Sequence, residues 1–148
     1  MSGFAITVPA AVGDEIRQHV GEQEPGFEAA GRLIVRTLDG RAVEYKRVRN
    51  GANVPERVMF SASWRPQPGH ISILVHSHPS GGPAPSDLDL QWATNRRYRG
   101  SEHRALFAIF AADFLHVWRI TDVATRSYER VPVVERRSSR RERVRAAA

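Results

Sequence analysis

Cysteine is absent from the 148 residues of this chain, which excludes disulfide bonds and thiolate ligands for a metal. Long apolar runs are absent too, since none approaches the roughly 20 residues that a helix needs to cross a bilayer. The first residues, MSGFAITVPAAVGDE, contain no basic segment followed by an apolar one. We therefore expect no membrane contact, no secretory signal and a cytoplasmic location.

The overall composition is that of one globular domain. Hydrophobic residues make up 41% and charged residues 26% of the sequence, which is typical of a folded protein rather than a disordered one. The length suffices for a single domain with a sizeable core and is too short for two ordinary domains. We place this domain at residues 1–134.

Positive charge is concentrated at the C-terminus. The chain carries +6 overall, and residues 135–148 (ERRSSRRERVRAAA) hold six arginines and two glutamates, which leaves only +2 for residues 1–134. With one valine and no aromatic residue, this segment is predicted to be a disordered, solvated tail. Its charge favours at most a weak contact with nucleic acid, and a solubilising role is the simpler interpretation.

The pattern of apolar and turn-forming residues predicts a mixed sheet with helices, an α/β or α+β fold. One helix is expected over residues 10–23, where apolar residues recur at helical spacing, and another over residues 86–97. Asp39-Gly40 is the strongest hairpin signal in the chain. The strands are expected at residues 4–9, 29–38, 41–50, 56–63, 70–78, 104–112, 114–122 and 127–134.

Two histidines follow an apolar strand in the sequence ISILVHSHPSGGPAPSDLD. Side chains two residues apart on a strand point to the same face, so His76 and His78 project together from the end of this strand. A pair of imidazoles is typical of a site for a divalent ion, most often zinc, which in catalytic sites takes a third protein ligand and leaves a position for water. Asp89, one turn into the following helix, is the candidate third ligand.

The same residues permit a purely structural interpretation. Isolated histidines are mostly surface or core residues, and SDLD (Ser86 to Asp89) fits a capping box, which begins a helix without any catalysis. The complete spacing, H-x-H-P, six residues, S, two residues, D, is much more specific than H-x-H alone, and it favours the metal site. Ser77 points away from both histidines and is expected to pack or to support the site. The remaining candidates are interpreted as structural or exposed residues: His70, Asp87, Trp92, His103 and His116.

The sequence HSHPSGGPAPSDLD resembles the signature of JAB/MPN domains, in their bacterial Mov34/MPN/PAD-1-like form, that carry the JAMM zinc-metalloprotease motif. This chain fills every specified position of the central motif, namely His76, His78, Pro79, Ser86 and Asp89.

The family motif also includes a glutamate just before an upstream strand. Here FEAAGRLIV supplies Glu28, with a glycine and a leucine at the expected offsets, although Ala30 replaces the usual cysteine. Two other glutamates, Glu22 and Glu24, precede Pro25 and lack a following strand. The resemblance covers residues 4–134.

By this resemblance the fold is the deaminase-like α/β core of MPN domains, a curved mixed sheet flanked by helices. It implies one zinc ion per chain, held by His76, His78 and Asp89. Glu28 would then be the general base that accepts a proton from water and passes it to the leaving amine. Ser86 would donate a hydrogen bond to the oxyanion of the tetrahedral intermediate.

The function implied is that of a zinc isopeptidase or peptidase that cleaves after the C-terminal glycine of a ubiquitin-like or sulfur-carrier protein. The extended tail of such a partner could pair with an exposed strand edge, and Asn53 is a weaker candidate for the substrate cleft. The alternative is a RadC-like or non-catalytic MPN module, associated with DNA repair or a protein complex, because HPSGGPAPS also looks like the loop of RadC-type proteins.

Overall fold

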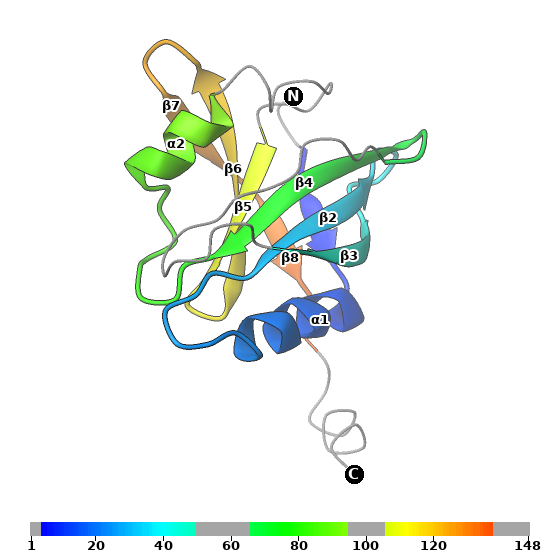
Figure 1. Cartoon of the computed structure of the whole chain (residues 1–148). Coiled ribbons are helices and arrows are strands. Elements are labelled where there is room, and N and C mark those ends of the chain that lie inside the picture. Colours follow the sequence, from blue (N-terminus) through cyan, green and yellow to red (C-terminus); the bar gives the residue numbers. More distant parts are fainter. Residues whose placement is uncertain (1–3, 50–65, 95–105, 138–148) are drawn as a thin grey trace.

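Strand β4 (His70–Ser77) occupies an inner position of the main sheet, as its apolar sequence predicts. The computed structural model describes residues 4–49, 66–94 and 106–137. In this part of the chain six strands form a sheet in the order β3-β2-β4-β5-β6-β7, with β4 and β5 parallel and the other neighbours antiparallel (Figure 1). The remaining strands of this sheet are β2 (Ala30–Arg36), β3 (Ala42–Val48), β5 (Leu106–Ala111), β6 (Phe114–Asp122) and β7 (Ser127–Val131).

Tight turns occur where the sequence predicts them. β2 and β3 pair on either side of Asp39-Gly40, and Gly40 has a φ of 71°. A Cβ atom at Gly40 would lie 2.1 Å from the carbonyl oxygen of Ala5, so glycine is required there. β5 and β6 turn at Ala112 and Asp113, which both have positive φ (51° and 65°). The predicted strand at residues 56–63 lies outside the described residues.

The two faces of the sheet bury different sets of side chains. Helix α1 (Ala10–Gly21) packs its buried residues Val12 and Ile16 into the larger cluster, which includes alternate residues of β2, β4 and β6. The opposite face of β5 and β6 carries a smaller cluster around Phe107 and Trp118. Helix α2 (Asp87–Ala93) closes this second face (Figure 1). Both helices were predicted, and residues 95–97 of the second lie outside the part described.

A two-stranded parallel sheet joins the ends of the described chain. β1 (Ile6–Val8) pairs with β8 (Val133–Glu135), and the N–H of Arg136 donates to the carbonyl of Val8 at 2.9 Å. An isolated bridge pairs Thr7 of this small sheet with Arg41, the residue just before β3.

The predicted boundary between domain and tail at Val134 needs correction. Glu135 belongs to β8, and its carboxylate, only 6% exposed, forms an ion pair with Arg17 of α1. Arg137 forms an ion pair with Asp113 at 2.9 Å. The first three residues of the expected tail are thus part of the folded domain, while residues 138–148 lie outside the described part.

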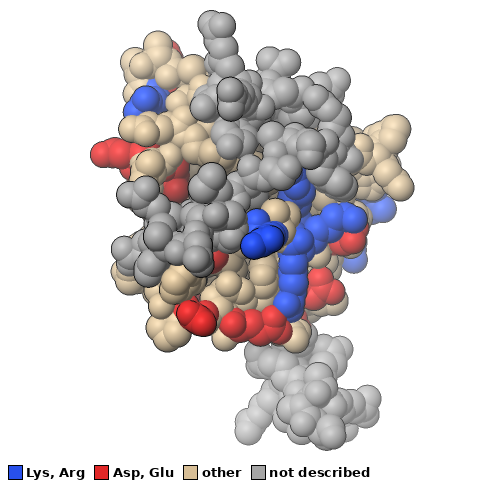
Figure 2. All heavy atoms as spheres, viewed as in Figure 1, with Lys and Arg blue, Asp and Glu red and all other residues tan. Residues whose placement is uncertain are grey.

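Charges of both signs lie on the face viewed in Figure 2. Lys and Arg side chains gather over β2 and β3, and Asp and Glu side chains lie along the edge toward α1. Arg47 of β3 forms an ion pair with Glu22, the C-terminal cap of α1, and Lys46 lies 3.6 Å from Glu44. Among the described residues no helix has the length and apolar character to cross a membrane.

Truncation of the chain tests where the folded domain ends. Ending the chain after Arg137 is expected to leave the free energy of unfolding unchanged, because residues 138–148 contain almost no apolar surface to bury. Ending it after Val134 removes Glu135 from its buried contact with Arg17 and should cost about 1–3 kcal/mol. Urea denaturation measures the free energy of unfolding of both truncated proteins. Equal stability of the two truncated proteins would contradict this boundary.

Candidate metal centre

His76 and His78 lie side by side at the C-terminal end of β4. Their Nε2 atoms are 3.1 Å apart, and the side chain of His76 is 1% exposed while that of His78 is 11% exposed. The N–H of His78 donates to the carbonyl of Phe110 at 3.0 Å, which continues the pairing of β4 with β5 by one residue. The predicted projection of both imidazoles to one side of the strand is confirmed.

Asp89 places its carboxylate against both histidines. Oδ1 lies 2.9 Å from Nε2 of His76, and Oδ2 lies 3.0 Å from Nε2 of His78. Helix α2 begins at this point through a capping box: Oδ2 of Asp89 accepts from the N–H of Ser86 at 2.9 Å, and Oγ of Ser86 accepts from the N–H of Asp89 at 3.1 Å. The helix start and the approach to the histidines therefore use the same carboxylate.

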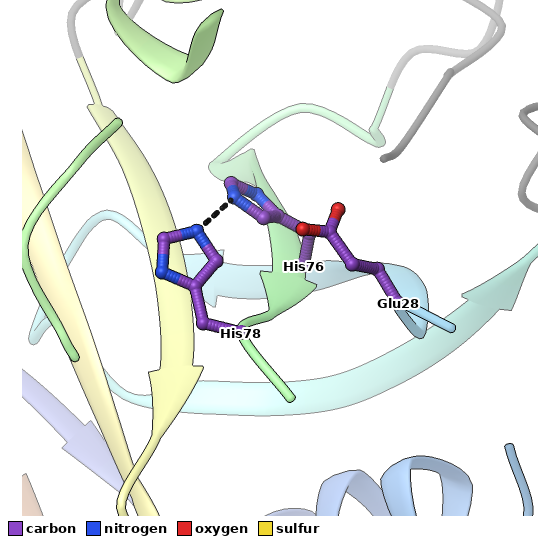
Figure 3. A group of neighbouring side chains, drawn as sticks. All are labelled: Glu28, His76 and His78. Atoms are coloured by element: carbon purple, nitrogen blue, oxygen red, sulfur yellow. Dashed lines mark hydrogen bonds between the residues drawn. The ribbon is translucent and has the colours of Figure 1, made fainter. Parts of the chain in front are cut away.

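Glu28 is a second carboxylate beside the histidines. One ligand atom each of Glu28, His76 and His78 lie within 4.8 Å of one another (Figure 3). The glutamate is buried in the segment that leads into β2. The next residue, Ala29, is held by Ser77: its N–H donates to Oγ of Ser77 at 2.8 Å, and its carbonyl accepts from the N–H of Ser77 at 3.0 Å. Ser77 thus fixes the backbone next to Glu28, as a residue that supports the site.

The contacts of the site shift the pKa values of Asp89 and His78. Burial alone would raise the pKa of Asp89, but hydrogen bonds from His76, His78 and the N–H of Ser86 outweigh it and hold this pKa well below its usual range. Burial alone would lower the pKa of His78, but its bonds to Asp89 and to the carbonyl of Gly82 outweigh that effect and raise it. An ionised Asp89 at neutral pH gives the site a negative charge that attracts a cation.

The donor atoms present fit a divalent metal ion. Zinc bonds of about 2.0–2.1 Å to nitrogen and oxygen place neighbouring ligands of a tetrahedral site about 3.3 Å apart. The facing atoms of His76, His78 and Asp89 are 2.9 to 3.1 Å apart, slightly closer than this spacing. Nδ1 of His78 lies 2.9 Å from the carbonyl oxygen of Gly82, which orients the ring and leaves Nε2 for a metal. Glu28 lies near enough to the histidines to be an alternative third ligand.

The other polar residues considered from the sequence lie away from this centre or outside the described residues. His116 contacts Arg130 at 2.9 Å, and His70 contacts the carbonyl of Pro68 at 3.1 Å. Asp87 is exposed in the first turn of α2, and Trp92 is partly buried against the cluster of Phe107 and Trp118. Asn53 and His103 fall in segments that the structure does not describe.

One contact near the site has no signal in the sequence. The indole N–H of Trp118, on β6, donates to the carbonyl oxygen of Pro83 at 3.0 Å. Pro83 lies in the loop that joins His78 to Ser86. The two partners are 35 positions apart, so only the folded structure brings them together.

Solved structures share this fold over nearly the whole chain. A protein from Desulfitobacterium hafniense, solved in solution, superposes with a TM-score of 0.62 at 16% sequence identity, covering 92% of this chain and 96% of that one. A protein from Salinibacter ruber, also solved in solution, superposes with a TM-score of 0.54 at 19% identity, covering 88% and 92%. At these identities the likeness concerns the fold alone. No curated protein is significantly similar in sequence.

The family comparison agrees with the fold and with the order of the elements. Residues 9–121 match the family described as prokaryotic homologs of the JAB domain. The matched region includes α1, Glu28, the two histidines and Asp89, and it extends through most of β6. The expected JAB/MPN-like core, a mixed α+β fold with two described helices, is thereby confirmed, and this chain belongs to the prokaryotic JAB domain family.

Proposed function

We propose that this protein is a zinc-dependent peptidase or isopeptidase of the JAMM type. The observation that carries the proposal is the meeting of two histidines, Asp89 and the buried Glu28 at one end of β4. Metal-assisted hydrolysis of an amide uses a metal site, a proton acceptor and a donor to the oxyanion. The residues around β4 offer one candidate for each role.

His76, His78 and Asp89 are the residues that would hold the ion, because the two Nε2 atoms lie about one ligand spacing from each other and each lies about that far from an oxygen of Asp89. Zinc bound there would supply a water of lowered pKa and a Lewis acid for the scissile carbonyl. Asp89 contributes a negative charge, and its bond to the N–H of Ser86 prevents it from turning away. We assign Asp89 as the third ligand rather than Glu28 because it contacts both imidazoles.

Glu28 is the candidate general base. Its carboxylate lies beside the histidines, and the backbone next to it is held by the hydrogen bond from the N–H of Ala29 to Oγ of Ser77. Glu28, unlike Asp89, is not part of a helix start. In this position it would accept a proton from water at the site and later deliver it to the departing amine.

Ser86 is the candidate donor to the oxyanion. Its Oγ already accepts the N–H of Asp89 at 3.1 Å, which uses a lone pair and leaves the O–H proton for another partner. The residue is exposed, so a substrate carbonyl can reach it. Loss of one such donor typically costs ~10²–10³ in rate.

The proposed substrate is the extended C-terminal tail of a ubiquitin-like or sulfur-carrier protein that ends in glycine. An extended tail can bind by adding a strand to an exposed sheet edge. Among the strands that the structure describes, β3 is the outermost on this side of the sheet, and its last residue, Val48, pairs with Ala30, which in turn pairs with His76. A tail aligned along this end of β3 would therefore lie two strands from the metal ligands.

Metal binding tests the ligand assignment through a matched pair of variants. The unaltered protein is expected to bind about one zinc per chain. Asp89→Asn keeps an oxygen for the N–H of Ser86 but loses the charge, so zinc affinity should fall by more than the 10–100-fold typical of residues outside the ligand shell. Asp87→Asn, an exposed position in the same turn, should bind as the unaltered protein does. Competition with a chelator measures the zinc affinity of all three proteins. Unchanged affinity in Asp89→Asn would refute the assignment of Asp89 as a ligand.

Replacing Glu28 tests the proton transfer. Glu28→Gln keeps size and most hydrogen bonding but cannot accept a proton, so cleavage of a ubiquitin-like fusion should fall by ~10²-fold or more. Zinc content and the melting temperature should not change. Glu24→Gln, an exposed position four residues earlier, is the control and should cleave normally.

Three other outcomes would each reject part of the proposal. Full activity of Glu28→Gln would remove this glutamate from the mechanism. Loss of zinc from Glu28→Gln would indicate that Glu28 is itself a ligand of the metal. An unaltered protein that binds zinc but cleaves no tail of this kind would favour a RadC-like or non-catalytic module instead.

A further inference from the structure

The loop between His78 and Ser86 is held at two successive carbonyl groups. The carbonyl of Gly82 lies 2.9 Å from Nδ1 of His78, and the carbonyl of Pro83 accepts the indole N–H of Trp118 at 3.0 Å. The loop also packs on the imidazole, because a Cβ atom at Gly81 would lie 3.7 Å from Nδ1 of His78. The carbonyl that orients His78 and the carbonyl that binds Trp118 therefore belong to adjacent residues of the loop.

Trp118 is itself held firmly in place. It is 8% exposed and belongs to the cluster that α2 covers. The guanidinium of Arg130 stacks on its ring at 4.6 Å from the centroid, and Tyr128 contacts it edge-on at 5.4 Å. Arg130 is in turn held by His116 at 2.9 Å. The indole therefore presents its N–H from a fixed position on β6.

A buried indole needs an acceptor for its N–H, so a hydrogen bond by itself would indicate only packing. The hydrogen bond of Trp118 is distinguished by where its acceptor lies in the chain. Pro83 lies in the one segment that connects a proposed metal ligand to the start of α2, and that segment has no strand or helix of its own. Without an external contact, two glycines in this loop, Gly81 and Gly82, would allow several backbone conformations.

We propose that Trp118 is a positioning residue of the metal site, which acts by fixing Pro83 and hence the Gly82 carbonyl that orients His78. This inference rests on the proposed metal site and extends it to a residue of β6 outside the motif. Partners that orient a ligating histidine typically contribute 10–100-fold in metal affinity. Trp118 acts on His78 through Pro83 and Gly82 and does not contact the histidine directly, so the expected effect on metal affinity is at the low end of that range.

The test uses Trp118→Phe, which keeps an aromatic ring in the cluster but removes the N–H donor. Trp92→Phe is the matched control, because Trp92 packs against the same cluster from α2. Two quantities are measured on each full-length protein. One is zinc affinity by competition with a chelator, and the other is the exchange rate of the His78 Nδ1 proton by NMR in the metal-free protein.

Trp118→Phe is expected to bind zinc about tenfold more weakly and to exchange the His78 Nδ1 proton faster, whereas Trp92→Phe should match the unaltered protein in both. Unchanged affinity and exchange in Trp118→Phe would overturn the inference while leaving the metal site intact. Equal losses in the two variants would also overturn it, since they would make the indole a packing group only. An unaltered protein without zinc affinity would reject the proposed function itself, and this inference with it.

Discussion

The carboxylate of Asp89 is the group on which the arrangement of the site depends. It accepts the backbone N–H that begins α2 and at the same time contacts both imidazoles at the end of β4. A helix cap is worth about 1 kcal/mol in its own right. In this protein the cap has a second consequence. It fixes the position of the helix start, where the loop after His78 ends. The start of the helix and the geometry of the histidines cannot change independently of each other.

The sheet supplies the rigid part of this arrangement. β4 is flanked by β2 and β5, so the residues next to His76 are bonded on both sides. Ser77 extends the pairing toward β2 and holds Ala29, which places Glu28 at the same end of the sheet. Loop segments carry Glu28 and Ser86, while a strand end carries the histidines. Residues from loops and from a strand end therefore meet at the site, as is usual where binding residues on loops are positioned by a rigid scaffold.

Much of this could be predicted from the sequence because the signals are local. The alternation of a strand places His76 and His78 together, the SDLD pattern begins a helix, and Asp39-Gly40 closes a hairpin. The family resemblance supplied Glu28, which no local pattern indicates. Other features are tertiary and left no local trace. Ser77 and Ala29 are 48 positions apart, and Trp118 and Pro83 are 35 apart. One strand was expected over residues 127–134, whereas the structure has two, β7 and β8, separated at Pro132, which has no N–H to donate, and β8 continues to Glu135.

The coordination of zinc itself is the most direct test of the central claim. A crystal structure of the zinc-loaded protein, with anomalous data at the zinc edge, would locate the ion and its ligands. The account predicts one ion bonded to Nε2 of His76, Nε2 of His78 and a carboxylate oxygen of Asp89 at about 2.0–2.2 Å, with Glu28 beyond bonding distance. An ion bonded to Glu28 in place of Asp89, or no ion at the histidines in zinc-saturated crystals, would contradict it.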